Sequence, residues 1–302
     1  MAIRSLLLIL LLSRTCLAQD DAEGTVKVDV KLVNMFVTVT DTNGAPVGSL
    51  NKEDFKILED GKEQKISIFD RQSELPLSII TAIDTSLSTK SHLKLETESA
   101  RHFAHAILRP VDAMALYQFS EIVSEVVPFT KDVERIDRGI ASIHPGSATA
   151  LYDAVCLGSE AMESRRGRKV MVVITDGGDT ASSNRYSDAL RAAQAAETIV
   201  YSIIIVPIEA SAGRDTGGEH ALIQISTDTG GKYYYATSLP QLDEAFRKIS
   251  DELRTQYLLA YYPAKRYTDS DFRRVDVKLT GASAAGFHAR HRAGYFTSSG
   301  HF

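Results

Sequence analysis

The sequence predicts an α/β fold, in which a doubly wound, mostly parallel sheet is inserted between β segments that form a small β-sandwich. Two observations lead to this prediction. Between residues 77 and 254, unbroken apolar runs alternate with helical stretches, which is typical of a parallel sheet covered by helices on both faces. Before and after this region, apolar and polar residues alternate with a period of two, as they do in half-buried strands.

Residues 25–72 make up the first β segment. Apolar side chains recur at alternate positions between residues 26 and 39, and turn sequences follow at 41–44 and 59–62. The second turn separates the apolar runs 55–58 and 66–69. We therefore expect an all-β unit before the α/β region.

Residues 75–254 make up the predicted α/β domain. Its strands are expected at 77–83, 113–119, 122–129, 170–175, 199–206 and 232–235. Its helices are expected at 91–108, 132–143, 151–164, 186–197 and 239–254. The run 122–129 follows the preceding strand so closely that an antiparallel edge hairpin is predicted. Ser238 is expected to cap the last helix, with Pro240 in its first turn, and the small polar stretch 210–218 indicates a loop.

Residues 255–298 return to the period of two and contain no helical stretch. Neither this segment nor residues 25–72 is long enough to close a core alone. We therefore expect the two segments to pair in one β-sandwich around the inserted domain. The alternative is two separate, small β appendages.

Oxygen-bearing side chains follow two of the predicted strands. Asp84 ends the first apolar run, with Ser86 and Ser88 directly after it, and Asp176 ends the fourth run. Open α/β sheets bind ligands at the carboxyl ends of their strands, where carboxylates and hydroxyls suit a hard cation. We expect Asp84 and Asp176 to point into one crevice, with Thr149 on an intervening glycine-containing loop as a further hydroxyl.

This set resembles the metal-ion-dependent adhesion site of von Willebrand factor type A domains. The pattern is D-x-S-x-S at 84–88, then Thr149, then T-D-G at 175–177. D-x-S-x-S alone is a weak signal, so the order of the three segments carries the resemblance. The whole chain also looks like the secreted bacterial proteins in which a type A domain, with its Rossmann-like sheet, is flanked by such strands.

The resemblance implies a bound Mg²⁺ or Mn²⁺ ion. Ser86 and Ser88 would bind it directly, Thr149 directly or through water, and Asp84 and Asp176 mainly through water. An open coordination position would then accept an Asp or Glu carboxylate from a protein partner. The expected function is an exported, non-enzymatic adhesion or assembly module.

The alternative function is a hydrolase or phosphoryl-transfer enzyme that uses the strand-end aspartates. Such an enzyme would need a second carboxylate two residues after Asp84, where Ser86 stands instead. The sequence also contains no G-x-S-x-G, P-loop or H-E-x-x-H pattern. A third possibility is a metal-free scaffold with a vestigial site, against which the complete set of oxygen ligands argues.

Other polar residues give weaker signals. Asp179 either hydrogen-bonds its loop or is a simple turn residue. His102 and His105 are three residues apart and could contact one metal ion, but without other histidines at hand a solvated helix face is the favoured interpretation. Cys156 lies in the apolar phase of an expected helix, which indicates a buried thiol rather than a nucleophile.

The composition argues against one class of partner, and the first residues predict an exported protein. The chain has 302 residues, 44% of them hydrophobic, and a formal net charge of −5, which argues against a nucleic-acid partner. Residues 1–18 have the pattern of a cleaved signal peptide, so a secreted or periplasmic location is expected. Cys16 could indicate a lipoprotein, but Arg14 and Thr15 fit a lipobox poorly. No stretch is long enough to span a membrane, and cleavage would leave Cys156 without an intramolecular disulfide partner.

Overall fold

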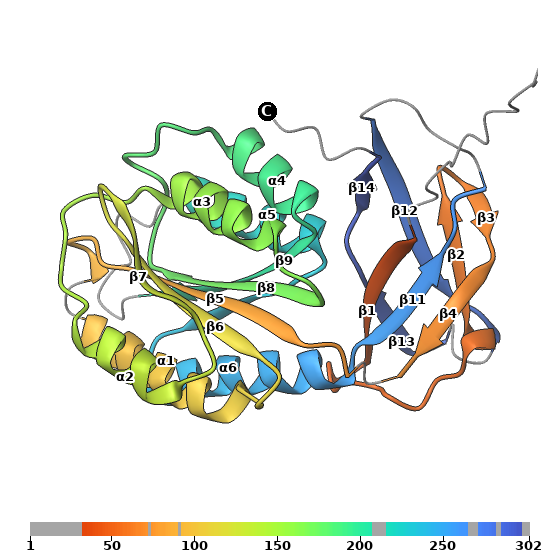
Figure 1. Cartoon of the computed structure of the whole chain (residues 1–302), viewed down its shortest axis with the longest axis horizontal. Coiled ribbons are helices and arrows are strands. Elements are labelled where there is room, and N and C mark those ends of the chain that lie inside the picture. Colours follow the sequence, from red (N-terminus) through yellow and green to blue (C-terminus); the bar gives the residue numbers. More distant parts are fainter. Residues whose placement is uncertain are drawn as a thin grey trace, which may run out of the picture. The chain divides into compact units, whose positions relative to one another are not determined.

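The computed structural model describes residues 32–71, 74–89, 92–206, 216–264, 271–281 and 285–297. The predicted signal segment 1–18 lies outside the described residues. The described residues form a six-stranded sheet covered by helices and two four-stranded antiparallel sheets (Figure 1). This arrangement confirms the predicted fold class.

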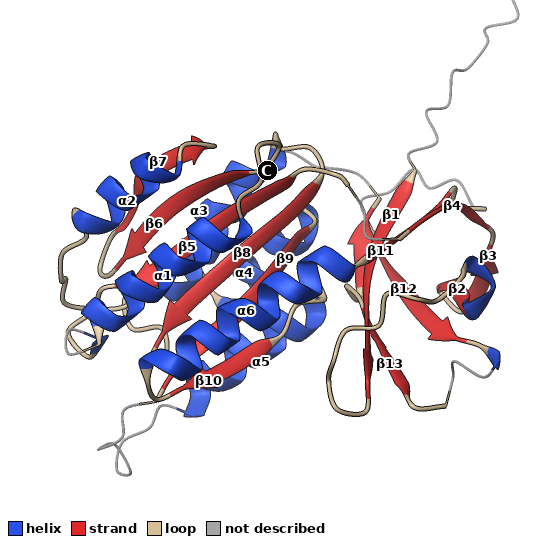
Figure 2. Cartoon of the chain, turned by 90° about the horizontal axis from the view of Figure 1, so that it is seen from below, coloured by secondary structure: helices blue, strands red, loops and turns tan. Residues whose placement is uncertain are grey.

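The central sheet is mostly parallel. Its strands are β5 (Leu77–Asp84), β6 (Ala113–Phe119), β7 (Val123–Thr130), β8 (Arg168–Thr175), β9 (Thr198–Ile205) and β10 (Tyr233–Ala236). They lie in the order β10-β9-β8-β5-β6-β7, and only β7 is antiparallel to its neighbour (Figure 2). The edge hairpin predicted at 122–129 is therefore confirmed. Every residue of β5 and β9 is buried, because helices cover both faces of the sheet.

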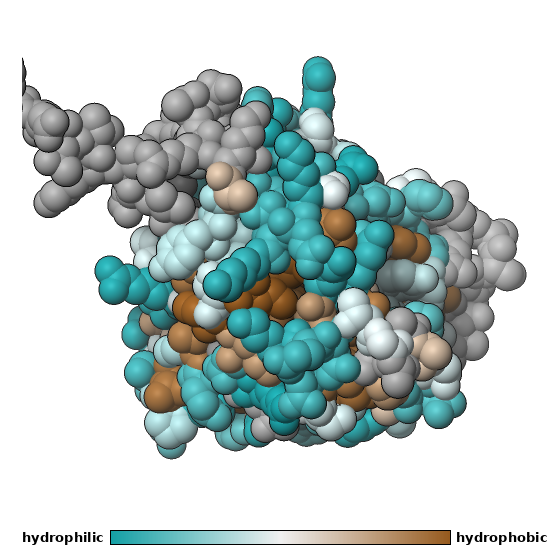
Figure 3. Space-filling model, turned by 90° about the vertical axis from the view of Figure 1, so that its right-hand side faces the viewer, coloured by the Kyte–Doolittle hydropathy of each residue, from teal (hydrophilic) through white to brown (hydrophobic). Residues whose placement is uncertain are grey.

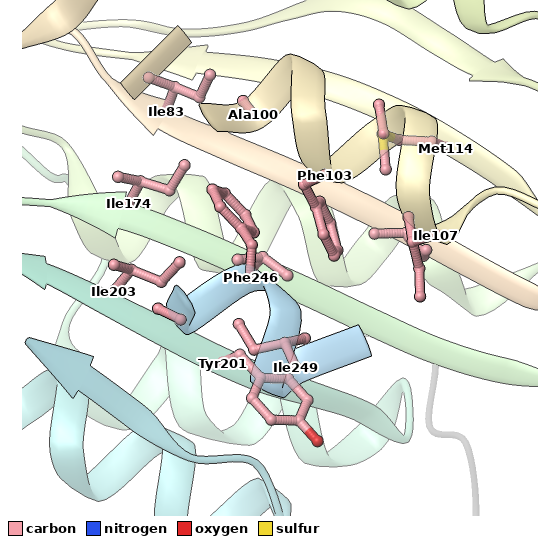
Figure 4. Packing of buried hydrophobic residues seen from close by; sticks show 14 of the residues in the cluster. Ile83, Ala100, Phe103, Ile107, Met114, Ile174, Tyr201, Ile203, Phe246 and Ile249 are labelled. Carbon is pink, nitrogen blue, oxygen red and sulfur yellow. The ribbon is translucent and has the colours of Figure 1, made fainter. Parts of the chain in front are cut away.

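Three helices cover each face of this sheet (Figure 1). The helices are α1 (Leu93–Ile107), α2 (Val133–Ala141), α3 (Leu151–Glu163), α4 (Tyr186–Ala195), α5 (Thr216–Thr229) and α6 (Leu239–Thr255). Helices α1, α2 and α6 pack on one face, where the rings of Phe103 and Phe246 stack 4.5 Å apart between their centroids (Figure 4). Helices α3, α4 and α5 pack on the other face. In the part of the chain that the structure describes, no helix is both long and apolar enough to cross a membrane.

Helix α5 differs from the sequence prediction, which placed only a loop at 210–218. Residues 207–215 lie outside the described residues, and α5 begins at Thr216. The buried stripe of α5 is half polar: Ser226 and Thr229 are buried beside the apolar Leu222 and Ile225. Ser238 stands at the predicted N-cap of α6, but its side chain makes no capping hydrogen bond.

Strands from both ends of the described chain build the β-sandwich. They are β1 (Val33–Asp41), β2 (Phe55–Glu59), β3 (Lys62–Gln64), β4 (Ile66–Asp70), β11 (Tyr257–Tyr261), β12 (Phe272–Leu279), β13 (Phe287–Arg290) and β14 (Gly294–Phe296), with a short 3₁₀ helix at Lys52–Asp54. One sheet has the order β13-β1-β11-β4 and the other β14-β12-β2-β3. The turn at 59–62 joins β2 to the short β3, whereas residues 66–70 cross to the other sheet as β4.

The core between these two sheets is largely apolar and contains a buried acid, Glu59. Met35, Ile57 and Leu259 are fully buried, and the hydroxyls of Tyr261 and Tyr295 donate to Glu59 Oε2 at 2.7 and 2.8 Å. The face of the molecule seen in Figure 3 is mostly hydrophilic, with hydrophobic side chains near the middle of the view. The sandwich therefore has its own core, separate from the two layers around the central sheet.

Candidate metal centre

The ends of β5 and β8 bring the predicted site residues to one edge of the sheet. The two strands are parallel neighbours, with Ile83 opposite Ile174. Asp84 therefore ends β5 at the same level at which Thr175 ends β8, and Asp176 follows directly. This edge is the carboxyl end of the parallel strands, where open α/β sheets bind ligands.

The loop after β5 is folded by its own hydrogen bonds. The Ser86 N–H donates to Asp84 Oδ1 at 2.8 Å. The Thr89 hydroxyl donates to the carbonyl oxygens of Asp84 and Ser86, at 3.1 and 3.0 Å. These contacts hold the Ser86 and Ser88 hydroxyl oxygens 3.0 Å apart. The D-x-S-x-S spacing thus places two hydroxyls side by side beside a buried carboxylate.

Two further hydrogen bonds join this loop to β8 and the residue after it. The Ser88 hydroxyl donates to Asp176 Oδ1 at 2.9 Å, and the Thr175 hydroxyl donates to Asp84 Oδ2 at 2.6 Å. Asp84 and Ser86 are buried, Ser88 is exposed and Asp176 is partly exposed. Four of the five predicted residues therefore form one cluster of oxygens that leads from the interior to the surface.

Main-chain hydrogen bonds hold Thr149, the fifth predicted residue, close to this cluster. Its loop is tied to the β5 loop because the Gly146 N–H donates to the Thr85 carbonyl at 2.6 Å. Thr149 itself donates its N–H to the Thr180 hydroxyl at 2.9 Å. Among the described residues, its hydroxyl makes no hydrogen bond to the other four predicted side chains. The structure therefore places the Thr149 loop at the site without joining its hydroxyl to the cluster.

Asp179 stabilises the loop after β8. Its Oδ1 accepts hydrogen bonds from the Tyr152 N–H at 3.2 Å and from the Ser182 hydroxyl, and its Oδ2 accepts from the Ser182 N–H at 3.3 Å. Of the two roles that the sequence allowed, the structure favours hydrogen bonding of the loop.

Burial shifts the acid–base behaviour of the two strand-end aspartates. It raises the pKa of the Asp84 carboxyl to about 6, although hydrogen bonds from Thr175 and Ser86 lower it. Burial also raises the pKa of Asp176, against the lowering effect of the Ser88 hydroxyl. Both groups are therefore carboxylates whose charge is poorly compensated at this edge of the sheet.

Glu96 is a third acid, which the sequence analysis did not identify. It is fully buried in the first turn of α1, and neither carboxyl oxygen has a hydrogen-bond partner among the residues that the structure describes. Burial raises its pKa well above the usual range, and repulsion from Asp84 and Asp176 adds to the shift. Its position offered a signal, because Glu96 falls in the same helical stripe as the buried Leu93, Ala100, Phe103 and Ile107.

The residues at this site fit a hard divalent cation. Two carboxylates and three hydroxyls supply only oxygen, which is the donor that Mg²⁺ prefers. No ion pair within the described ranges involves Asp84, Glu96 or Asp176, so a cation would offset charge that the protein leaves unpaired. Within the same ranges, no three His, Cys, Asp or Glu side chains group closely enough to hold a metal ion by themselves. The hydroxyls are therefore essential to any metal site at this edge.

His102 and His105 face different partners on the surface. His102 Nδ1 lies 3.4 Å from Asp243 Oδ1, and His105 Nε2 lies 2.9 Å from Asp137 Oδ2. Both side chains are more than half exposed. This agrees with the interpretation of a solvated helix face.

Comparisons with known proteins agree with this fold. Residues 79–178 match the family profile of the von Willebrand factor type A domain. No match was found among curated protein sequences.

Several solved structures are similar to the chain. A von Willebrand factor type A protein from Catenulispora acidiphila covers 88% of this chain and 74% of its own, with 11% identity and a TM-score of 0.53. The pilus adhesin SpaC from Lactobacillus rhamnosus GG covers 86% of this chain and 42% of its own, with 12% identity and a TM-score of 0.50. The PilB minor pilin from Streptococcus sanguinis covers 61% of this chain and 62% of its own, with 14% identity and a TM-score of 0.48, so the match spans less than two thirds of that pilin. The family match and the strand order of the central sheet lead to one conclusion: residues 79–178 belong to a von Willebrand factor type A domain.

Proposed function

We propose that the protein is an exported, non-enzymatic module that binds protein partners through a Mg²⁺ or Mn²⁺ ion. The ion would be held by Asp84, Ser86, Ser88, Thr149 and Asp176. The observation that carries this proposal is the cluster of oxygens that joins the ends of β5 and β8 and reaches the surface at Ser88. Export is proposed from the sequence of residues 1–18, which lie outside the described part of the chain.

Four of these residues have distinct parts in this proposal. The hydroxyls of Ser86 and Ser88 would bind the ion, and Asp84 holds their loop through the Ser86 N–H. Asp176 orients the Ser88 hydroxyl by accepting its hydrogen bond. When bound, the ion supplies an open coordination position for a carboxylate from a partner. Because Asp84 and Asp176 are the only carboxylates that belong to the oxygen cluster among the described residues, the ion would stay electrophilic enough to attract a carboxylate from a partner.

The enzymatic alternative fits the geometry of Asp84 poorly. A carboxylate nucleophile must reach its substrate, but Asp84 is fully buried. Its two oxygens accept hydrogen bonds from the Ser86 N–H and the Thr175 hydroxyl. A binding role also agrees with the type A domain, whose fold is shared by a pilus adhesin.

Calorimetric titration of the metal-free protein with MgCl₂ or MnCl₂ tests the metal site. We expect one saturable site, weakened at least about tenfold, or about 1.4 kcal/mol, by Asp84→Asn and by Ser88→Ala. Ser187→Ala, at an exposed position of α4, is the matched control and should bind like the wild type. At a free ion concentration of about 100 times Kd, the ion should add about 2.7 kcal/mol to the free energy of unfolding.

The absence of saturable binding, or equal binding by the Asp84→Asn variant, would contradict the metal site. A pull-down from an extract of exported proteins, in Mg²⁺ and then in EDTA, tests the binding of protein partners. Retention of the same proteins in EDTA would contradict a bridging role for the ion.

A further inference from the structure

Two exposed apolar side chains lie at the same edge of the sheet as the candidate metal site. Among the described residues, the most exposed large hydrophobic side chains are Ile122 and Leu87, at 69% and 62%. Leu87 lies between Ser86 and Ser88, and Ile122 lies in the turn between β6 and β7, at the same carboxyl edge of the sheet. We call Leu87 and Ile122 the apolar rim.

Hydrogen bonds fix the loops that carry the apolar rim. The Thr85 N–H donates to the Phe119 carbonyl at 2.8 Å, which ties the β5 loop to the end of β6. The Leu87 N–H donates to the Ser147 carbonyl at 3.5 Å. Ser147 in turn donates its N–H and its hydroxyl to Glu121 Oε2, at 2.9 and 2.8 Å. Leu87 and Ile122 are thus held on neighbouring loops whose order does not depend on a partner.

Neither side chain of the apolar rim contributes to the folded core. The Leu87 side chain has no polar atom, so the side-chain hydrogen bonds of the D-x-S-x-S loop do not involve it. A single exposed apolar residue needs no explanation. Here, however, the two most exposed of them border one proposed binding position, where a partner would remove them from water.

Glu121 adds a fixed negative charge beside Ile122. It is exposed, and hydrogen bonds from the N–H and the hydroxyl of Ser147 hold its pKa at about 2. Glu121 is therefore ionised at any physiological pH. A partner segment with a second acid would be repelled here, whereas a Lys or Arg would be attracted.

We propose that the apolar rim and Glu121 select partners in which the metal-binding Asp or Glu is flanked by a large apolar residue and by a Lys or Arg. The proposal rests on the proposed function, because the partner's carboxylate must first reach the bound ion. The rim would supply apolar contact, and Glu121 would set the preferred sign of the neighbouring charge. The partner class is thus an extended or looped protein segment with mixed character, not a generally acidic surface.

A display library of peptides with a fixed central Glu and random flanks is the probe. Selection on the whole protein in Mg²⁺ should enrich Leu, Ile or Phe at one flank and Lys or Arg at the other. A synthetic peptide of the enriched sequence should bind at least about fivefold more weakly to the Leu87→Ser and Ile122→Ser variants. Glu121→Gln should reduce the preference for a basic flank.

Val111→Ser is the matched control, because Val111 is an exposed apolar residue, at 49%, just before β6 at the opposite edge of the sheet. It should bind the peptide like the wild type. Mg²⁺ affinity, measured directly by calorimetry, should be equal in the wild type and in all of these variants, which shows that the site is folded.

The outcomes separate the two proposals. If no acidic peptide is enriched in Mg²⁺ relative to EDTA, the proposed function fails and this inference fails with it. If acidic peptides are enriched in Mg²⁺ but their flanks stay random, the inference is overturned and the proposed function stands. Equal peptide binding by the wild type and the Leu87→Ser and Ile122→Ser variants would overturn it in the same way.

Discussion

At the scale of single residues, the candidate site brings together acidic side chains that are buried or partly buried. Asp84 and Glu96 are fully buried, and Asp176 is partly so, yet none has an ion-pair partner among the described side chains. A carboxyl group whose pKa is higher in the folded than in the unfolded protein adds stability that is fully present below the unfolded pKa. That stability is lost as the pH rises through the folded pKa. For Asp84, with a pKa raised from 3.8 to about 6, the loss is about 3 kcal/mol in the metal-free protein.

Glu96→Gln isolates the contribution of the acid behind the site. Because Gln carries no charge at any pH, the metal-free variant should gain stability relative to the wild type as the pH rises from 4 to 8. We expect a gain of about 1–3 kcal/mol, since ionising the buried Glu96 is unfavourable. Urea unfolding at several pH values measures this gain in stability. Mg²⁺ should reduce the difference in stability between the two proteins, because it stabilises the ionised form of Glu96 in the wild type.

Comparing the wild type with the Glu96→Gln variant also cancels the effect on stability of groups that have the opposite pH dependence. Burial lowers the pKa of His291, so that residue makes the fold less stable as the pH falls, equally in both proteins. Glu98→Gln, two positions further along α1, controls for the loss of a helical carboxylate. A difference between wild type and Glu96→Gln that is the same at pH 4 and pH 8 would show that Glu96 is not the titrating group.

At the scale of elements, the buried strands could be predicted because their sequences permit little else. β5 and β9 are covered on both faces, so nearly continuous apolar runs mark them, and a run stops where its strand leaves the sheet. That stop is also where Asp84 and Asp176 stand, which is why the cluster of site residues was predictable from the same pattern. Glu96 was missed, although it lies in the buried stripe of α1, because a Glu in the first turn of a helix usually faces water and favours the helix dipole.

Helix α5 could not be predicted because hydrogen bonds replace apolar contact in its buried stripe. The Ser226 and Ser202 hydroxyl oxygens lie 2.9 Å apart, which satisfies both groups against β9. The Thr229 hydroxyl donates to the Ile225 carbonyl at 2.8 Å and accepts from the Val200 N–H at 3.0 Å. A helix buried in this way lacks the apolar period that sequence analysis depends on.

Gly231, in the link from α5 to β10, lies very close to the main chain of β9. A Cβ at this position would lie 1.9 Å from the Val200 carbonyl oxygen, a main-chain atom of β9 that cannot turn away. We expect Gly231→Ala to lower the free energy of unfolding by about 1–3 kcal/mol or more. Gly177→Ala, where no heavy atom lies within 4 Å of the added Cβ, should change it by less than about 0.5 kcal/mol. Equal urea midpoints for the two variants would contradict the close approach.

At the scale of the whole molecule, strands from distant parts of the sequence share each sheet of the sandwich. β1 pairs with β11 and β2 pairs with β12, so the strands before and after the α/β region complete one another. A polar contact also links β13 to α6, because Arg290 donates to Glu252, whose side chain is only 3% exposed. Glu252 further accepts hydrogen bonds from the hydroxyls of Tyr201 and Tyr234, at 3.2 and 3.1 Å.

Arg290→Ala tests whether this contact couples β13 to the helical layer. Removing one partner of a buried ion pair leaves the other charge uncompensated, which costs about 3–5 kcal/mol. Lys232 Nζ lies 3.8 Å from Glu252 Oε1 and should reduce the loss of stability towards the lower value.

Arg247→Ala is the matched control: Arg247 pairs with Glu244 and Asp251 on the exposed side of α6, where an ion pair contributes about 0–1 kcal/mol. Adding Glu252→Gln to Arg290→Ala should restore part of the stability, because it removes the buried charge itself. Urea unfolding followed by circular dichroism measures all four proteins. If Arg290→Ala costs no more than Arg247→Ala, the contact is incidental, and the pairing of β1 with β11 and β2 with β12 is what holds the two ends of the described chain together.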